Sequence, residues 1–469
     1  MSLFPPRPLF THSGQTTYHE IRTDAKTTDF MLKKVMVLLG LTLVLAAGVW
    51  LYSQLYSSTA AINWTEIHQT MDGFGGAAAD FVTSLTPAQA DFFFTTSGIG
   101  LSILRTQIIP DQATCDASFR KGGCSNSNGQ ILNGELASAQ LAVARGAIVF
   151  STPWSPPGVY KSNGSFTNGG SLLPSHYSDW AREIATYVTM MAAAGVPVYA
   201  VSVQNEPNIT VNYGSCIYTA QQIHDFVPYL YSALQSAGAG ATKIMIAEQS
   251  SWSIDLTAPA MADPKVAPDI GLMAAHGYGG KIRPYNTGNI RLWQTEDSSQ
   301  SPTYDGSIAD GLQWAQTIHE YLSVANANAW VWWFLTDMPN QGEGTDNAAL
   351  TDFHGNFPKR TYVTGQWSKF VRPGWSRVGI RYFGPVQITA FKDPGSHSFA
   401  IVAVNSNNRS VRQTFSMNGS PASSVTPWIT SAELSLAAQT PVPVNNSKFA
   451  YDLPESSVTT FVGSLLGQH

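Results

Sequence analysis

Charged residues are scarce in this sequence. Lys, Arg, Asp and Glu make up 12% of the 469 residues, against about a quarter in an ordinary globular protein. The formal net charge is −5, so the chain lacks the basic field with which proteins attract nucleic acid, and we expect no nucleic-acid partner. The polar surface must come from Ser, Thr, Asn, Gln and Gly. Apolar residues form 43% of the chain, which is enough for a large core, and the length favours one large domain with a further part attached.

Cysteine is nearly absent, with three residues in the whole chain: Cys115, Cys124 and Cys216. No Cys-x-x-Cys motif or Cys/His cluster has the spacing of a metal site, so we expect no metal ion and no other cofactor. Cys115 and Cys124 lie in a stretch rich in Gly, Ser and Asn, and they would close a small disulfide loop in an oxidising compartment. Cys216 would then remain a free and buried thiol.

The N-terminal part contains a long uncharged apolar run, residues 35–52, which follows Lys33 and Lys34. Basic residues before such a run, and Ser58-Thr59-Ala60 after it, fit a signal peptide within residues 31–61. The run is also long enough to span a bilayer, so an uncleaved membrane anchor is the alternative, and we favour cleavage. Either interpretation predicts an exported protein, secreted or periplasmic. Residues 1–30 are polar and rich in proline near their start, and we expect them to be disordered.

Strand-like and helix-like segments alternate from residue 72 onward, which is typical of βα units and a parallel sheet. Helical periodicity covers residues 176–194 and 220–236, and Gly195-Val196-Pro197 marks a helix end. Eight strands with helices between them predict a (β/α)8 TIM barrel in residues 72–368, an α/β fold. The eight strand candidates are residues 73–77, 101–105, 147–151, 199–205, 243–248, 272–276, 292–296 and 329–333.

The pattern changes after about residue 370, where short runs of alternating character are separated by turn formers. This spacing predicts an antiparallel β-sandwich side domain. Residues 62–71 are also strand-like and precede the first barrel strand, so we expect the second domain to consist of residues 62–71 plus 369–469. The strand candidates of this domain are residues 386–392, 398–405, 412–417, 423–430 and 458–463.

Two of the barrel strand candidates lead into a glutamate, Glu206 and Glu296. A parallel barrel gathers the C-terminal ends of its strands around one mouth, where catalytic groups collect. Pro207 ends the first of these strands by removing a backbone donor, which places Glu206 where the strand becomes a loop. Cleavage of a glycosidic bond by an enzyme generally requires two carboxyl groups that lie at one mouth. Glu248 ends another strand candidate and is a competitor that spacing does not exclude, although we expect it to lie beside the site.

Seven motifs occur in the order seen in glycoside hydrolase family 30, and the chain resembles that family from about residue 62 to its end. The resemblance implies a (β/α)8 barrel with an attached β-sandwich and a retaining mechanism, with Glu206 as the acid/base and Glu296 as the nucleophile. The motifs are Asp72-Gly73-Phe74-Gly75-Gly76, Thr152-Pro153-Trp154-Ser155-Pro156-Pro157, Gln204-Asn205-Glu206-Pro207, His276-Gly277-Tyr278, Trp293-Gln294-Thr295-Glu296, residues 359–368 and Arg372-Pro373-Gly374.

Further site residues follow from the same resemblance. Arg105, at the end of the second strand candidate, matches an arginine near the nucleophile, and Trp154 matches a tryptophan of the sugar subsites. Tyr278 is expected to hydrogen-bond the nucleophile, and Trp333 to form a floor on which a sugar ring stacks. Asn205 is placed to hydrogen-bond a sugar hydroxyl. We expect His276 to hydrogen-bond beside the site, and Trp330 and Trp332 to pack in the core.

The motifs resemble most the xylanase branch of the family. Members specialised for glucuronoxylan carry an arginine after the eighth strand, which pairs with the glucuronate carboxylate. Residues 334–339 contain no arginine, and Asp337 would repel a carboxylate. We therefore expect an endo-β-1,4-xylanase without strict glucuronate dependence, acting as a monomer on a polysaccharide or oligosaccharide. The alternatives are a β-1,6-galactanase or β-1,6-glucanase, then a glucosylceramidase, or a glycan-binding protein without catalysis.

Overall fold

A computed structural model describes residues 36, 59–79, 84–108, 110, 130–336, 347–352, 354–418 and 422–466. Except for Met36, these residues belong to one compact unit, Ser58–His469. The expected Cys115–Cys124 disulfide, the sequence around Asp337 and, but for Met36, the apolar run lie outside the described residues. In the part that the structure describes, no helix is both long and apolar enough to cross a bilayer.

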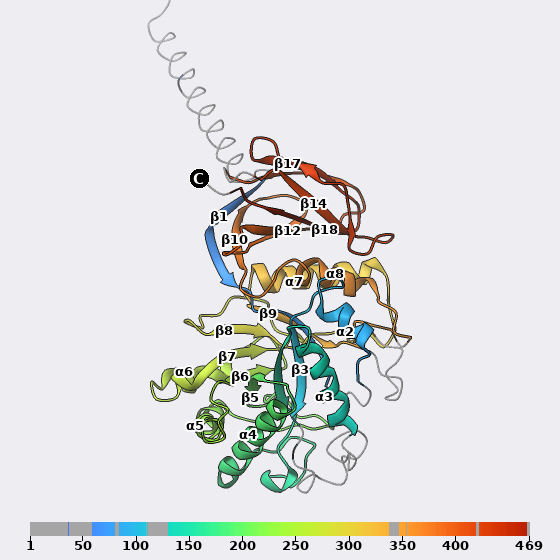
Figure 1. The fold of residues 1–469 in the computed structure, drawn as a ribbon. Coiled ribbons are helices and arrows are strands. Elements are labelled where there is room, and N and C mark those ends of the chain that lie inside the picture. The colour runs from blue at the N-terminus through green and yellow to red at the C-terminus, as the bar shows by residue number, and fades with distance from the viewer. Residues whose placement is uncertain are drawn as a thin grey trace, which may run out of the picture. The chain divides into compact units, whose positions relative to one another are not determined.

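Eight parallel strands close into a barrel in chain order, from β2 to β9 (Figure 1). The predicted TIM barrel is confirmed, and each predicted strand overlaps an observed one. One prediction is wrong in register: Arg105 does not end its strand but lies in the middle of β3, because the buried run continues to Ile108. The strands are β2 (Gly73–Ala77), β3 (Ile103–Ile108), β4 (Ile148–Pro153), β5 (Val198–Ser202), β6 (Lys243–Gln249), β7 (Ile270–Ala275), β8 (Arg291–Gln294) and β9 (Ala329–Phe334).

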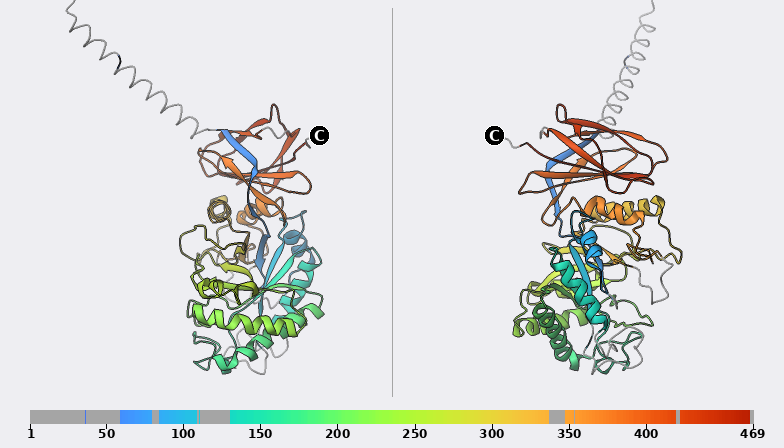
Figure 2. Two further views of the ribbon diagram at one scale, coloured as in Figure 1. Left: turned by 90° about the vertical axis from the view of Figure 1, so that its left-hand side faces the viewer. Right: turned by 45° about the vertical axis from the view of Figure 1, so that its right-hand side comes forward.

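Helices cover the outside of the barrel, as the green helices α4 and α5 show (Figure 2). Both were predicted from the apolar period, and α5 begins with a capping box in which Thr219 and Gln222 exchange hydrogen bonds. Such a box satisfies backbone donors that a helix start leaves unpaired. The helices are α2 (Pro87–Phe94), α3 (Gln130–Val143), α4 (Tyr177–Ala193), α5 (Ala220–Ser236), α6 (Ala258–Ala262), α7 (Ile308–Ser323) and α8 (Lys359–Ser368).

The inside of the barrel is filled by side chains. Trp293 of β8 is fully buried there, with its ring centroid 5.7 Å from that of Phe150 and 5.9 Å from that of Tyr199. Its indole nitrogen donates to Oδ2 of Asp72 at 2.8 Å. Because this layer closes the interior, a ligand has access only at an end of the barrel.

The remaining strands form one ten-stranded, mainly antiparallel sheet. Its order is β15-β14-β18-β12-β11-β10-β1-β13-β17, and β16 pairs with β14. The sheet curls on itself, because Phe461 of β18 packs against Phe415 of β13 and Phe449 of β17, at ring distances of 5.0 and 5.1 Å, although these strands are far apart in the order. The strands are β1 (Thr59–Thr70), β10 (Ser376–Arg381), β11 (Gln387–Lys392), β12 (Ser398–Asn405), β13 (Val411–Ser416), β14 (Ser424–Thr430), β15 (Ala437–Ala438), β16 (Val442–Pro443), β17 (Lys448–Leu453) and β18 (Ser457–Ser464).

Strand β1 lies inside this sheet, although it precedes the barrel in the sequence. It pairs antiparallel with β10 and parallel with β13. The expected pairing of residues 62–71 with the C-terminal strands is therefore observed. The sequence did not predict β10, β15, β16 or β17.

Helices α7 and α8 lie between the barrel strands and this sheet (Figure 1). Buried polar contacts join the two: Gln366 of α8 donates to Thr430 at 2.8 Å and accepts from Thr460 at 2.6 Å. Trp367 donates its indole N–H to Thr389 at 3.1 Å. Helix α8 therefore binds the sheet through buried hydrogen bonds, and α7 also packs against it.

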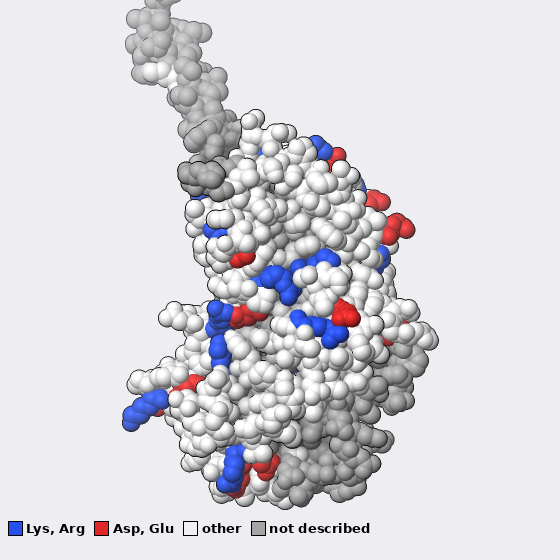
Figure 3. Space-filling view, viewed as in Figure 1, with Lys and Arg blue, Asp and Glu red and all other residues white. Residues whose placement is uncertain are grey.

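The surface agrees with the composition. Charged side chains are few and scattered in the space-filling view, and uncharged residues cover most of the face that is shown (Figure 3). Among the described residues Cys216 is a free cysteine, and it is fully buried, as predicted.

Candidate active site

Glu206 and Glu296 lie at the same end of the barrel, just past the ends of β5 and β8. Each is 6% exposed. The chain turns sharply at Glu206, where φ is 44°, and its amide donates to the carbonyl of Glu248 at 3.0 Å. The carbonyl of Glu296 accepts from the amide of Gly277 at 2.8 Å. Bonds to neighbouring strand ends therefore fix both glutamate backbones.

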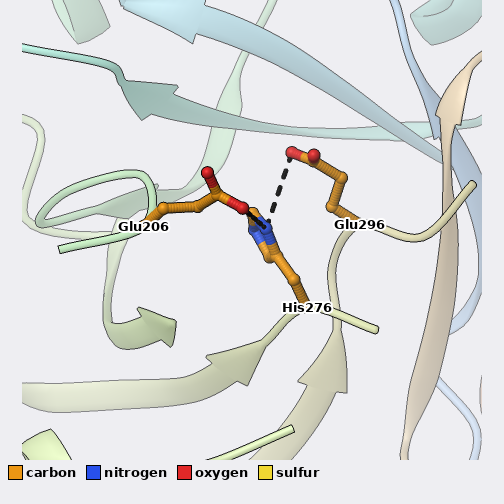
Figure 4. Close-up of side chains that lie close together, drawn as sticks. All are labelled: Glu206, His276 and Glu296. Atoms are coloured by element: carbon orange, nitrogen blue, oxygen red, sulfur yellow. Dashed lines mark hydrogen bonds and ion pairs between the residues drawn. The ribbon is translucent and has the colours of Figure 1, made fainter. Parts of the chain in front are cut away.

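The side chains of Glu206 and Glu296 point toward each other with the imidazole of His276 between them (Figure 4). Nδ1 of His276 is 3.1 Å from Oε1 of Glu206 and 3.8 Å from Oε2 of Glu296. One carboxylate oxygen of each glutamate and a ring nitrogen of His276 all lie within 4.8 Å of one another. The two carboxyl groups are thus close neighbours.

His276 carries a proton at neutral pH. Burial alone would lower its pKa, but Glu296, Glu206 and Glu248 together raise it to about 9. The buried imidazolium offers a cation to carboxylates from three different strand ends. We expected His276 to hydrogen-bond beside the site, and the structure places it between the two glutamates, in contact with both.

Arg105 is the second buried cation of the site. Its guanidinium pairs with Oε2 of Glu296 and with Oε1 of Glu248, the latter at 3.1 Å, and donates to Oδ1 of Asn205 at 2.7 Å. Arginine suits this position because its five donors are held in a planar fork. The contact occupies the amide oxygen of Asn205 and so fixes the orientation of that side chain.

Glu248 is the third glutamate of the site, contacts Arg105 and is fully buried. Burial alone would raise its pKa, but Arg105 and His276 outweigh that effect and lower it. Thr152 also donates to Oε2 of Glu248 at 3.1 Å. Glu248 therefore balances the charge of Arg105 and His276 and has no exposed surface with which to meet a ligand.

Two aromatic rings lie beside Arg105. The rings of Trp154 and Trp333 are 5.7 Å apart, and the guanidinium carbon of Arg105 is 4.7 Å from the first ring and 5.5 Å from the second. Trp333 is half-buried. The structure thus places both rings beside Arg105, with Trp154 buried, and their contact with a sugar stays a prediction. Trp330 and Trp332 are fully buried in the core, as predicted.

Tyr278 lies on the other side of Glu296. Its hydroxyl is 3.3 Å from Oγ of Ser298. Burial, and then the nearby charge and hydrogen bond of Glu296, raise its pKa well above the usual value. The hydroxyl therefore keeps its proton and remains a possible donor to the carboxylate, and the expected bond to the nucleophile stays a prediction.

Sequence analysis missed Asp297, which follows Glu296 directly. It is buried, its carboxyl presses against Gly277, and burial raises its pKa to about 7. Gly277 has no side chain, and a Cβ there would collide with this carboxyl. The sequence could have indicated this contact, because a glycine follows His276 directly and an acidic residue follows Glu296 directly.

Glu206, His276 and Glu296 also form the one group among the described residues whose donor atoms are close enough to hold a metal ion. The residues do not fit such an ion well, because metal binding needs a neutral imidazole, whereas these carboxylates hold the proton on His276. Arg105 already occupies the carboxylate of Glu296. The chemistry of the donors favours acid–base work over metal binding.

Comparison with known proteins agrees with the site. Residues 134–349 match the model of the glycosyl hydrolase family 30 TIM-barrel domain. The glucuronoxylanase XynC of Bacillus subtilis strain 168 is 30% identical over 455 residues, which cover 92% of this chain and 96% of the relative. The endo-1,6-beta-D-glucanase neg1 of Aspergillus fumigatus is 24% identical over 442 residues, 77% of this chain and 85% of the relative.

Solved structures show the same likeness. The family 30 subfamily 8 xylanase Xyn30A of Clostridium acetobutylicum superposes with a TM-score of 0.76 at 32% identity, and the match covers 87% of this chain and 100% of that one. The catalytic domain of the family 30 xylanase C of Talaromyces cellulolyticus gives a TM-score of 0.73 at 25% identity, covering 87% and 100%. The barrel, the curled sheet and these matches over nearly the full length together show that the chain belongs to glycoside hydrolase family 30 and is an O-glycosyl hydrolase.

Proposed function

We propose that this chain is a retaining endo-β-1,4-xylanase that does not depend strictly on glucuronate. The observation that carries the mechanism is the closeness of the two carboxyls, with oxygens of Glu206 and Glu296 within 4.8 Å. Retaining glycosidases place their carboxyls about 5–5.5 Å apart, whereas inverting ones leave about 6.5–9.5 Å for a water molecule. The separation of these oxygens fits the shorter range, that of retaining enzymes.

In the first step, Glu296 attacks the anomeric carbon and forms a covalent glycosyl–enzyme bond, while Glu206 gives its proton to the departing oxygen. Arg105 holds one oxygen of Glu296, which orients the carboxylate toward the substrate. Arg105 contacts the carboxylate of Glu296 and not that of Glu206, which supports Glu296 as the nucleophile and leaves Glu206 for proton transfer.

In the second step, Glu206 takes a proton from water, and the water oxygen displaces Glu296 from the anomeric carbon. The sugar leaves with its original configuration. His276 remains a donor to Glu206 through both steps, so it stabilises the carboxylate each time the proton departs.

The choice of xylan rests on the relatives. XynC of Bacillus subtilis is named a glucuronoxylanase, and Xyn30A a xylanase, and both are more similar to this chain than the 1,6-glucanase is. Trp154 and Trp333 offer the aromatic surface that a sugar ring needs. The absence of arginine from residues 334–339 argues against a strict requirement for a glucuronate group.

We further propose that the chain is exported, secreted or periplasmic, and acts as a monomer. Support comes from the apolar run at residues 35–52 behind two lysines. Cleavage of the run would release the enzyme, and an uncleaved run would anchor it.

The test is product analysis on linear xylan, glucuronoxylan and β-1,6-glucan, with the anomeric form of the first product followed by proton NMR. We expect xylo-oligosaccharides from both xylans, released first as the β-anomer. Glu206→Gln and Glu296→Gln should each lower kcat at least about 100-fold. Activity on β-1,6-glucan alone, or an α-anomer as first product, would overturn the proposal.

A further inference from the structure

Lys161 is a buried lysine outside the group of residues that surround the two glutamates. Its residue is 3% exposed. The ammonium donates to Oγ of Ser155 at 2.9 Å, to the carbonyl of Phe166 at 3.1 Å and to the carbonyl of Ser215 at 2.6 Å. An ammonium has three donors, and here all three are used.

The acceptors of Lys161 belong to two loops at the site. The first, residues 154–173, follows β4, begins with Trp154 and includes Ser155 and Phe166; we call it the Trp154 loop. The second, residues 206–219, follows β5 and ends with the cap of α5; we call it the Glu206 loop. Lys161 therefore joins the two loops that start at the aromatic surface and at Glu206.

The two loops also touch through backbone bonds around the ammonium. Asn168 donates to the carbonyl of Val211 at 2.9 Å, and Ile217 to that of Gly170 at 2.7 Å. A Cβ added to Gly214 would lie 3.2 Å from Cβ of Trp154 and would collide with the ring of Phe166. The Glu206 loop thus packs directly against Trp154, so a shift between the loops would move this ring.

The charge of Lys161 is balanced by no carboxylate, since no ion pair of the described residues includes it. Burial lowers the pKa of Lys161 to about 8. Burial in turn raises the pKa of Cys216 to about 12, so the thiol stays neutral. Ser155 and the two carbonyls are neutral as well. The three charge-assisted hydrogen bonds are what keeps this cation buried.

We propose that Lys161 is a positioning residue that fastens the Trp154 loop to the Glu206 loop, and so sets how tightly a glycan chain binds. The inference rests on the proposed function for its choice of substrate. A neutral amine keeps two donors for three acceptors, so the connection weakens when the ammonium loses its proton.

The first test compares KM and kcat for xylohexaose at pH 7. Lys161→Met removes the donors, Lys161→Arg keeps the charge, and Lys265→Met changes an exposed lysine of another loop. We expect Lys161→Met to raise KM about 5–20-fold with kcat within about twofold, because three hydrogen bonds are lost. Lys161→Arg should recover part of the loss, and Lys265→Met should change nothing. A wild-type KM in Lys161→Met would overturn the proposal, as would equal losses of kcat and folded protein.

The second test needs no substrate. Hydrogen–deuterium exchange of the amides of Asn168 and Ile217 reports on the bonds between the loops. Their protection should fall in Lys161→Met at pH 7, and in the wild type between pH 7 and 9 after correction for intrinsic exchange. Unchanged protection in both would overturn the proposal. If the wild type leaves xylohexaose intact, the proposed function fails, and exchange alone decides whether Lys161 holds the loops.

The dependence of stability on pH, read together with KM, separates a positioning role of Lys161 from a purely structural one. The pKa of Lys161 is lower in the folded chain than its ordinary value of 10.5, so the unfolded chain binds the extra proton between about pH 8 and 10.5. The wild type should therefore gain stability relative to Lys161→Met over this range, while its KM for xylohexaose rises. A KM that improves together with stability would contradict the proposed role.

Discussion

Nδ1 of His276 lies 3.1 Å from Oε1 of Glu206, so the carboxyl that we assign to proton transfer is hydrogen-bonded to a buried cation. The same ring nitrogen is 3.8 Å from Glu296. One imidazolium therefore stabilises negative charge on whichever glutamate carries it, and the two carboxyls need not repel each other across the bond that they cleave.

The first prediction concerns this imidazolium. His276→Asn keeps a donor close to the position of Nδ1 but removes the charge, and we expect kcat to fall about 10–100-fold, the worth of a hydrogen bond to a charged group. Because the pKa of His276 is about 9, kcat of the wild type should decline above that pH. A pH–rate profile of the variant should lack this decline, and a profile that keeps it would assign the ionisation to another group.

The raised pKa of His276 also predicts how the stability of the fold changes with pH. The folded value of about 9 exceeds the ordinary value of 6.5, so the stabilisation from the proton is complete below about pH 6.5 and is lost as pH rises to 9. Urea unfolding at pH 6 and pH 9 should show a larger loss for the wild type than for His276→Asn. Equal losses would show that the proton on His276 does not stabilise the fold.

Glu248 predicts an effect on folding. Replacing one partner of a buried ion pair leaves the other charge uncompensated, so Glu248→Gln should cost about 3 kcal/mol of unfolding free energy. The folded pKa of Glu248 lies below its ordinary value of 4.5, so its contribution is present above that pH and is lost as pH falls. Denaturant unfolding from pH 7 to 3 measures both effects. Asp452→Asn, in an exposed ion pair with Arg412, is the matched control and should cost little.

For Asp297 we predict the opposite dependence of stability on pH. Its pKa rises from 3.8 to about 7 on burial, so the folded chain binds more protons between these values and loses stability as pH increases. Asp297→Asn should therefore be more stable than the wild type at pH 7.5, by up to about 1.4 kcal/mol for each pH unit of the shift. Thermal melts at pH 5 and pH 7.5 would show the gain widening with pH, and a constant difference would contradict the argument.

Trp154 and Trp333 predict an effect on substrate binding. Trp333→Ala removes the half-buried ring of the pair and should raise KM for xylohexaose about 3–10-fold, with kcat less affected, since ring stacking contributes about 0.5–1.5 kcal/mol. The control variant is Tyr229→Ala, which removes an exposed tyrosine ring of α5. An unchanged KM in Trp333→Ala would remove this ring from the binding surface.

Most of the architecture could be predicted because apolar strands end in polar residues at the mouth of a parallel barrel. Glu206 and Glu296 stand out as acids after such runs, and the structure brings them together. Strand β10 escaped prediction because only two of its six residues, Val378 and Ile380, are apolar. Its buried Arg377 donates to Gln69 and Asn326, contacts that form only in the folded chain.

Charge states were harder to predict than positions. The proton on His276 depends on three glutamates from three strands, and the burial of Lys161 depends on two loops that meet only in the folded chain. The local sequence does not show which residues become neighbours after folding. Arg105 was placed at a strand end because the apolar run before it looked complete, whereas the strand continues through polar but buried residues to Ile108.

The place of β1 within the curled sheet has a consequence for biosynthesis. Its partners β10 and β13 begin at Ser376 and Val411, more than three hundred positions after Thr70. At about 5–20 residues per second, a ribosome needs tens of seconds to supply them. The barrel can assemble during that interval, but the leading strand must wait with its backbone groups unpaired. A chaperone that shields it would act early in translation, and removal of the last hundred residues would leave it permanently without its neighbours.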